Sequence, residues 1–204
     1  MFLVVEGVDG TGKSTQVARV AARLRERGRE VVETFEPGAT AVGAAMRDVL
    51  LDSSSELAPL AEALLLTADR AQHVAEVVRP ALERGADVVS DRYVPSSLAY
   101  QGVARALGID TVDALNRVAT GGLDADLVVV LDLPGELAAA RREGSDRLEA
   151  EDAAFHDAVR RGYLGLAAGR SWIVIDGTAE PEAVADEIMA AVDAVLASDQ
   201  GPGR

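Results

Sequence analysis

Cysteine is absent from this chain of 204 residues, and lysine occurs only once. Without cysteine the chain can form neither a disulfide framework nor a thiolate metal site, which fits a reducing cytoplasm. No apolar run reaches the ~18 residues of a membrane helix, and no basic segment precedes an apolar one near Met1. We therefore expect a cytoplasmic protein without a signal peptide or a membrane partner.

Positive charge is scarce as well. The net charge is −14, which argues against nucleic acid or an anionic membrane as a partner. A protein this acidic binds a polyanionic ligand only where arginines gather locally, so clusters of arginine are candidate sites.

Short apolar segments typical of buried strands alternate with segments of helical periodicity. The expected strands are Met1–Glu6, Glu30–Phe35, Asp87–Ser90, Leu127–Leu131 and Ser171–Ile175. The first expected helix runs from Ser14 to Gly28, and the others are Thr40–Leu51, Leu57–Glu83, Ser96–Leu107, Thr111–Thr120, Glu136–Arg142, Ala153–Ala168 and Pro181–Ala197. This alternation predicts a single α/β domain over residues 1–197, followed by a flexible tail at 198–204. Its parallel sheet would carry helices on both faces.

The single lysine lies in a glycine-rich segment, Gly7-Val8-Asp9-Gly10-Thr11-Gly12-Lys13-Ser14-Thr15. Its first eight residues follow the G-x-x-x-x-G-K-S pattern of the phosphate-binding P-loop, in which the lysine holds phosphates and the serine binds Mg²⁺. The expected strand before it and helix after it would place phosphate at a helix N-terminus. A chance glycine turn, the alternative, leaves the position of the only lysine unexplained. We therefore expect residues 7–15 to bind ATP.

Asp91 and Arg92 directly follow the expected strand Asp87–Ser90. Ligands of open α/β sheets bind beyond the carboxyl ends of the strands. Asp91 is therefore the expected second Mg²⁺ ligand, and Arg92 is expected to face a phosphate. The alternative is an ordinary ion pair at the protein surface.

Two helical faces carry further candidates. Leu66 and Arg70 lie one turn apart, which suits a nucleoside base with its phosphate close by; the alternative is an amphipathic core helix with an exposed arginine. Ser97, Tyr100 and Gln101 share a face of the next helix, although a serine there could simply cap it. Both histidines, His73 and His156, are expected to be structural or solvated.

A polar stretch around Gly144 holds three arginines, Arg141, Arg142 and Arg147. It suggests a lid at about residues 135–150 that closes on the phosphates being transferred. The alternative is a solvated charged loop, which the neighbouring acidic residues would also fit.

Together these segments resemble the thymidylate kinase family of nucleoside monophosphate kinases. The resemblance runs from Met1 to about Ile175 and rests on Gly7–Thr15, Glu36-Pro37-Gly38, Ala68–His73, Asp91–Tyr93, Ser96–Gly102, Asp126–Asp132 and Asp146–Glu149. It implies the P-loop kinase fold and phosphorylation of dTMP to dTDP by ATP with Mg²⁺, in the synthesis of dTTP. It also implies a homodimer formed through helical faces.

The resemblance implies a role for each matching residue. Asp9 would bind the sugar 3′-hydroxyl, Arg70 and Arg92 the acceptor phosphate, and Tyr100 would exclude a 2′-hydroxyl. Ser97 and Gln101 would approach thymine, and Glu36 would shape the loop on the acceptor side. Gly10 together with the arginine-bearing lid indicates the branch of the family whose lid supplies the catalytic arginine.

The chain departs from the family pattern at two places. Phe35 and Ala39 flank Glu-Pro-Gly where Arg and Gly are usual, and Leu66 stands where a phenylalanine usually stacks on thymine. Three other functions remain open at this stage: another small P-loop nucleotide or deoxynucleoside kinase, a P-loop switch or ATPase, and an inactive binding paralogue. Arg70 and Arg92 favour a phosphorylated acceptor. The single lysine excludes a guanine-recognition motif, which needs a second one.

Overall fold

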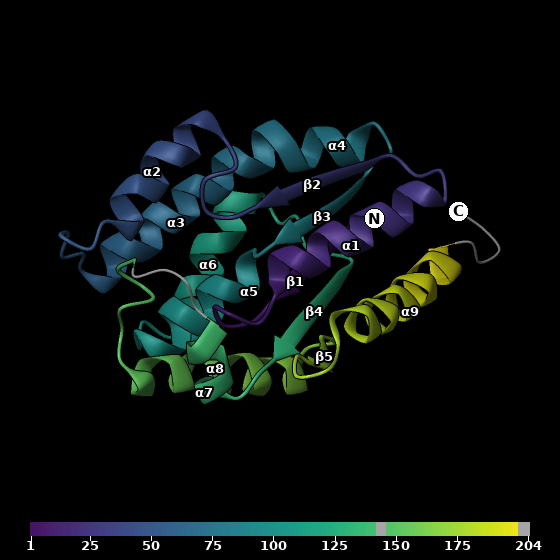
Figure 1. Cartoon of the computed structure of the whole chain (residues 1–204). Coiled ribbons are helices and arrows are strands. Elements are labelled where there is room, and N and C mark those ends of the chain that lie inside the picture. Colours follow the sequence, from purple (N-terminus) through teal and green to yellow (C-terminus); the bar gives the residue numbers. More distant parts are fainter. Residues whose placement is uncertain (142–145, 200–204) are drawn as a thin grey trace.

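A parallel sheet forms the centre of the molecule (Figure 1). The computed structural model describes residues 1–141 and 146–199. Its strands pair in the order β2-β3-β1-β4-β5, all of them parallel. They are β1 Phe2–Glu6, β2 Val31–Phe35, β3 Asp87–Asp91, β4 Leu127–Asp132 and β5 Ile173–Asp176. The expected α/β class and all five expected strands are therefore confirmed, to within about two residues at their ends.

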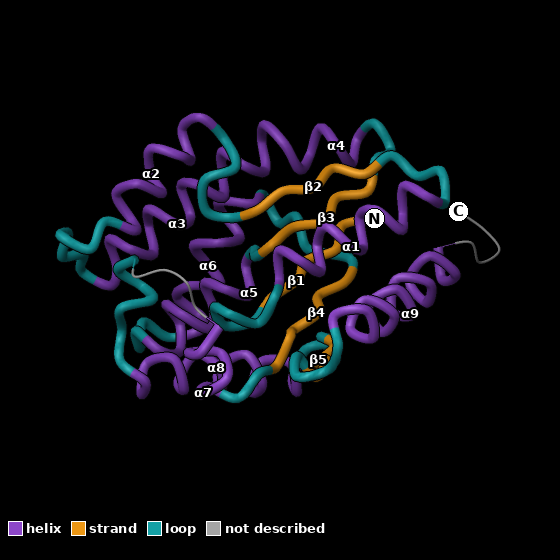
Figure 2. The backbone as a smooth tube through the Cα atoms, viewed as in Figure 1, coloured by secondary structure: helices purple, strands orange, loops and turns teal. Residues whose placement is uncertain are grey.

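Helices connect the strands and follow the expected ranges closely. They are α1 Lys13–Glu26, α2 Ala41–Leu51, α3 Pro59–His73, α4 Arg79–Glu83, α5 Val94–Ser97, α6 Ile109–Thr120, α7 Gly135–Arg141, α8 Ala153–Gly169 and α9 Pro181–Asp199. Figure 2 shows the helices surrounding the orange strands. No helix of residues 1–141 and 146–199 is long and apolar enough to cross a membrane.

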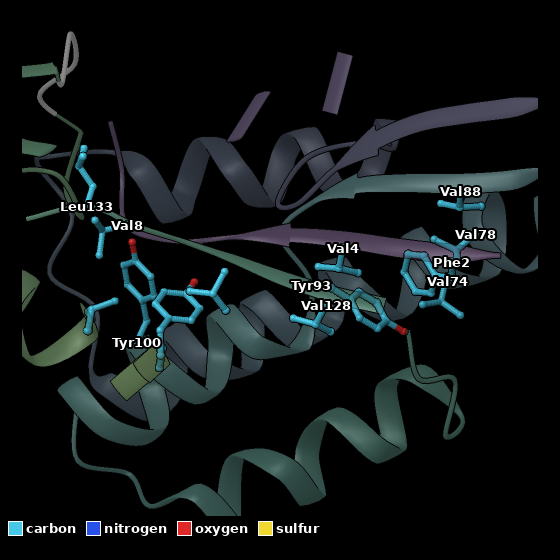
Figure 3. Packing of buried hydrophobic residues seen from close by; sticks show 14 of the residues in the cluster. Phe2, Val4, Val8, Val74, Val78, Val88, Tyr93, Tyr100, Val128 and Leu133 are labelled. Carbon is cyan, nitrogen blue, oxygen red and sulfur yellow. The ribbon is translucent and has the colours of Figure 1, made fainter. Parts of the chain in front are cut away.

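The two faces of the sheet pack against different helices. Along β1, Leu3 and Val5 belong to a cluster with apolar residues of α1 and α9. Phe2 and Val4 point to the other face, which packs against the helical segments that flank β3 and against α8. Figure 3 shows part of this second cluster, including Phe2, Val4 and Tyr93. Alternate residues of one strand thus bury against opposite layers, as a doubly covered sheet requires.

The expected helix Leu57–Glu83 differs in one respect, because it contains a π-helical segment at Val74–Val78. The N–H of Arg79 bonds to the carbonyl of Val74, five residues back. Pro80 follows, and a proline ring clashes with the carbonyl four residues earlier in a regular α-helix. The wider turn therefore accommodates Pro80 without ending the helix.

The expected helix Ser96–Leu107 is also modified. It begins earlier, at Val94, with Pro95 in its first turn, and it continues as a π-helix over Leu98–Ala104. Proline suits the first turn of a helix because its missing N–H would have no partner there. The π-helix carries Tyr100 and Gln101, two of the expected site residues.

Candidate active site

The glycine-rich segment forms the turn between β1 and the N-terminus of α1. Gly10 and Gly12 have φ angles of 87° and 86°, which only glycine adopts without strain. A Cβ atom at Gly10 would lie 2.4 Å from the carbonyl oxygen of Ala138 in α7. Neither arginine nor any other side chain could occupy position 10 in this structure.

Lys13 is buried at the start of α1. Its Nζ donates to the carbonyl of Val8 at 3.0 Å and lies 3.6 Å from Asp9 Oδ1. Burial and the nearby Arg92 charge lower the pKa of Lys13, while Asp9, Asp91 and Glu6 oppose the shift. The ammonium is held at the mouth of the loop, where phosphates would meet it.

Ser14 and Asp91, the two expected magnesium ligands, lie next to each other. Ser14 Oγ donates to Asp91 Oδ2 at 2.6 Å, across 77 residues of sequence. Residues 1–141 and 146–199 contain no cluster of three or more histidine, cysteine or acidic side chains that would hold a metal by itself. Two neighbouring side-chain oxygens beside the glycine-rich loop would suit Mg²⁺, which usually takes one or two protein ligands and fills its shell with phosphate oxygens and water.

Arg92 lies just beyond β3 with a φ angle of 73°, a left-handed conformation that is uncommon outside glycine. Its Nη1 donates to Gly7 O at 3.2 Å, Ser96 Oγ at 3.0 Å and Tyr163 Oη at 3.3 Å. Its Nη2 forms an ion pair with Asp9. These contacts hold the strained residue in place and aim its guanidinium at the loop.

Asp9 lies between the two cations Lys13 and Arg92. Burial alone would raise the pKa of Asp9, but the charges of Arg92 and Lys13 outweigh burial and hold it well below its usual range. Tyr100 Oη also donates to Asp9, at 3.2 Å. Asp9 is therefore ionised and makes bonds to three of the site residues.

A large cavity of about 690 Å³ opens over the loop. Asp9, Gly10, Gly12, Lys13, Ser14, Thr15, Asp91, Arg92 and Arg141 are among the residues that line it. Gly7, Val8 and Thr11 do not line it. They shape the loop from behind, since the Val8 carbonyl accepts from both Lys13 and Thr11.

A second cavity of about 100 Å³ adjoins the first. The expected acceptor residues come together there, and its lining includes Leu66, Arg70, Ser97, Tyr100 and Gln101. Asp9, Glu36, Arg47 and Arg92 line both cavities. Leu66 is half-buried, so its side chain is available to a ligand.

Arg70 is the largest fully buried side chain among the described residues, and hydrogen bonds hold it on several sides. Its Nε donates to Glu36 Oε2 at 2.8 Å, its Nη1 to Ser97 Oγ at 2.8 Å and to Asn116 Oδ1, and its Nη2 to Tyr93 O at 2.9 Å. Glu36 also bonds to His73 Nδ1 at 2.8 Å. Glu36 thus anchors Arg70, and His73 is a structural residue, as expected.

Arg141 and Arg147, two of the three arginines of the expected lid, lie at different places in the structure. Arg141 lines the large cavity, and its Nη1 donates to Gly177 O at 3.3 Å. Arg147 does not line that cavity. Its Nε donates to Leu50 O and its Nη1 donates to Glu62 Oε2, both at 2.8 Å. Arg142 lies outside the described residues.

Sequence reasoning missed several residues around these cavities. Tyr163 in α8 donates to Glu6 Oε2 at 2.8 Å and contacts Arg92, although it is far from both in sequence. Burial raises the pKa of Glu6, which accepts from Ser96 and from the backbone of Tyr93 as well. Among the missed residues, Arg47 could have been found from the sequence, because it is an arginine that follows the expected acceptor-side loop Glu36-Pro37-Gly38.

The chain is similar to one family of known proteins along most of its length. The thymidylate kinase family profile matches residues 5–188. Proteins named thymidylate kinase from Deinococcus radiodurans and Thermomicrobium roseum are 48% and 47% identical to it, over 197 and 201 residues. These alignments cover 94% and 96% of this chain, and 96% and 95% of the two relatives. Since both cavities are lined by residues within the matched region, the geometry and the comparisons agree, and the chain belongs to the thymidylate kinase family.

Proposed function

We propose that the protein transfers the terminal phosphoryl group of ATP to the phosphate of dTMP, giving dTDP for the synthesis of dTTP. The observation that carries this proposal is that a phosphate-loop cavity and a smaller, partly apolar cavity meet at Arg92 and Asp9. Two phosphorylated ligands, one in each cavity, would bring their phosphates together at that junction. Family membership makes the activity that of a phosphotransferase.

The large cavity is the proposed ATP site. Backbone N–H groups of the loop and the N-terminus of α1 would surround the phosphates, and Lys13 would contact the outer ones. Ser14 and Asp91 would hold Mg²⁺, which would neutralise phosphate charge when bound. The cavity volume of about 690 Å³ is large enough for a nucleotide, which supports this proposal.

The second cavity is the proposed dTMP site. Arg92 would bind the acceptor phosphate from the side of the loop, with Arg70 on the other side. Asp9 and Tyr100 would meet the deoxyribose, and Leu66, Ser97 and Gln101 would surround the base. A kinase for an unphosphorylated nucleoside would have no use for two arginines at this place, so the phosphorylated acceptor is preferred.

The reaction requires positioning and charge stabilisation more than proton transfer. The acceptor phosphate already carries a nucleophilic oxygen, so no strong general base is needed. Arg92 would align that oxygen, and Lys13 would stabilise charge on the transferred group. Arg141 lines the proposed ATP cavity, so of the two lid arginines that the structure describes it is the one that would also stabilise this charge.

A coupled assay of ADP release with ATP and each nucleoside monophosphate in turn tests the proposal. We expect turnover with dTMP to exceed turnover with dCMP, dAMP and dGMP. Lys13→Ala should abolish it, because no other side chain of the loop replaces the ammonium. Folded Lys13→Ala protein with substantial ADP release would contradict the mechanism, and equal turnover of thymidine and dTMP would contradict the acceptor.

We further propose that the protein acts as a cytoplasmic homodimer. Helices α2, α3 and α6 pack in series and leave large apolar side chains exposed, with Val118 of α6 exposed to 86%. The others are Val42 and Val49 of α2 and Leu60 and Leu64 of α3. Light scattering should give twice the mass of the chain, and Val118→Asp should shift it to the monomer. A monomeric wild-type protein at micromolar concentration would reject the dimer.

A further inference from the structure

Glu62 is a carboxylate buried close to the dTMP cavity without lining it. It lies one helical turn before Leu66 and two turns before Arg70 on α3, and it is 0% exposed. Burying a carboxylate destabilises the fold unless the charge is paired, so the partners of Glu62 indicate its role.

Three side chains converge on Glu62. Oε1 accepts from Gln101 Nε2 at 2.8 Å and from Arg105 Nε at 3.3 Å. Oε2 accepts from Arg105 Nη2 at 3.2 Å and from Arg147 Nη1 at 2.8 Å. Two arginines therefore neutralise Glu62, while its remaining contact holds the amide of Gln101.

This contact fixes which way round the Gln101 amide lies. A carboxylate flanked by two arginines can only accept hydrogen bonds, so the NH₂ group of Gln101 must face it. The carbonyl oxygen, Oε1, must then lie on the opposite side of the amide. That oxygen is buried and has no hydrogen-bond partner within the described part of the chain, and Gln101 lines the dTMP cavity.

We propose that Glu62 is a positioning residue that sets the hydrogen-bonding character of the acceptor site. It holds Gln101 so that the cavity presents a fixed acceptor, the Oε1 oxygen, to the base of the nucleotide. This inference rests on the proposed dTMP site and names a residue that acts on it from outside.

The consequence is selection by base chemistry. Thymine and uracil carry an imide N–H that satisfies the free oxygen, whereas cytosine has an unprotonated ring nitrogen at the same place. A cytosine would leave two acceptors facing each other and a buried oxygen unpaired, which is strongly unfavourable. Without Glu62 the amide is free to turn over and offer its NH₂ group to cytosine.

The test is the relative affinity for dTMP and dCMP in the variant Glu62→Gln, measured by calorimetry on the full chain. An amide at position 62 can face Gln101 with either its oxygen or its nitrogen, so it no longer dictates the orientation. We expect the preference for dTMP over dCMP to fall about tenfold or more, the size of one buried hydrogen bond left unmade. Equal loss of affinity for both nucleotides, or no change in their ratio, would overturn the proposal.

Glu151→Gln is the matched control. Glu151 pairs with the same Arg105, at 2.5 Å. In the described part of the chain it makes no hydrogen bond with Gln101, and it lines neither cavity. This variant should keep the wild-type preference. In a Gln101→Leu background, Glu62→Gln should have no further effect on the preference, because the group that Glu62 orients is gone.

A measurement on the wild-type protein covers the case in which Glu62→Gln fails to fold. The side-chain amide protons of Gln101, assigned by comparison with Gln101→Leu, should be shifted and protected from exchange before any nucleotide is added. Rapidly exchanging, averaged amide signals would overturn the role of Glu62 whether or not the enzyme phosphorylates dTMP. Conversely, absence of dTMP turnover with a protected amide would reject the proposed function and leave the orientation intact.

Discussion

Arg92 combines an unusual backbone conformation with five side-chain contacts. A non-glycine residue in the left-handed region costs roughly 1–2 kcal/mol, and such conformations concentrate at functional sites. Gly7, Ser96, Tyr163, Tyr100 and Asp9 all bond to its guanidinium. The strain therefore serves to hold one positive charge at the junction of the two cavities.

Removing the charge of Arg92 should weaken binding of the acceptor dTMP more than binding of ATP. We expect Arg92→Ala to raise the KM for dTMP about 100-fold and to lower kcat, because charge-assisted, bidentate phosphate contacts are the strong ones. The KM for ATP should change less. Arg92→Lys keeps the positive charge but loses the two-pronged guanidinium, so its KM for dTMP should lie between those of the wild type and of Arg92→Ala. A variant in which only the KM for ATP rises would assign Arg92 to the other substrate.

Leu66 offers a test of the base-binding wall. It is half-buried and lines the cavity proposed for dTMP, so a larger side chain has space on the side of that cavity. We expect Leu66→Phe to preserve or improve dTMP binding, by up to ~1 kcal/mol if the ring stacks on the base. The melting temperature and the KM for dTMP should be measured on the same sample. A lower melting temperature with an unchanged KM would mean that Leu66 is ordinary core, where overpacking costs ~1–3 kcal/mol.

At the scale of elements, α7 ends in Arg141, the arginine that lines the cavity proposed for ATP. The backbone of α7 lies against Gly10, so the helix borders the glycine-rich loop as well as this cavity. We expect Arg141→Ala to lower kcat by about 10³-fold with little change in either KM, the pattern of an arginine that acts on the transferring phosphate.

Arg147→Ala is the comparison variant for Arg141→Ala. Because Arg147 bonds to Leu50 O and Glu62, its loss should lower the melting temperature and have a smaller effect on kcat. If Arg147→Ala proves to be the slower enzyme, the role assigned to Arg141 belongs to Arg147.

Much of the architecture was predictable from local patterns. The five strands, the phosphate loop and the placement of Asp91 at a strand end follow from apolar runs, glycine spacing and the lone lysine. The π-helical segments were not predictable, because they depend on how Pro80 and the residues after Ser97 are accommodated within long helices. Tyr163 and Glu62 were missed for another reason: their partners Arg92 and Gln101 are remote in sequence and meet them only in the folded chain.

At the scale of the whole molecule, acid sensitivity is expected from buried carboxylates that are ionised in the fold. Asp87 opens β3, is 1% exposed, and accepts from Arg29 Nη2 at 2.7 Å. Burial would raise the pKa of Asp87, but its bonds to Arg29 and the terminal amine hold it below the usual 3.8. Its stabilising contribution is therefore present above about pH 4 and is lost as the pH falls through the lowered pKa.

Asp87→Asn measures this contribution. We expect the variant to lose about 1–3 kcal/mol of unfolding free energy at pH 7, since a buried charge-assisted bond is removed. The difference from wild type should shrink as the pH approaches 3 or below, where the wild-type carboxylate is protonated too. Urea unfolding at both pH values provides the comparison. A difference that stays constant between them would show that packing, and not charge, makes Asp87 important.

The carboxylate of Asp9 pairs with both Lys13 and Arg92, so these two cations already have a partner before any of the proposed ligands binds. An incoming anion must therefore compete with the Asp9 carboxylate for Lys13 and Arg92, and the net negative charge of the protein also repels it. We therefore expect free phosphate and sulfate, which make no contacts beyond these cations, to inhibit only weakly. We expect a nucleotide, whose base and sugar make further contacts, to compete for Lys13 and Arg92 more effectively than small anions do.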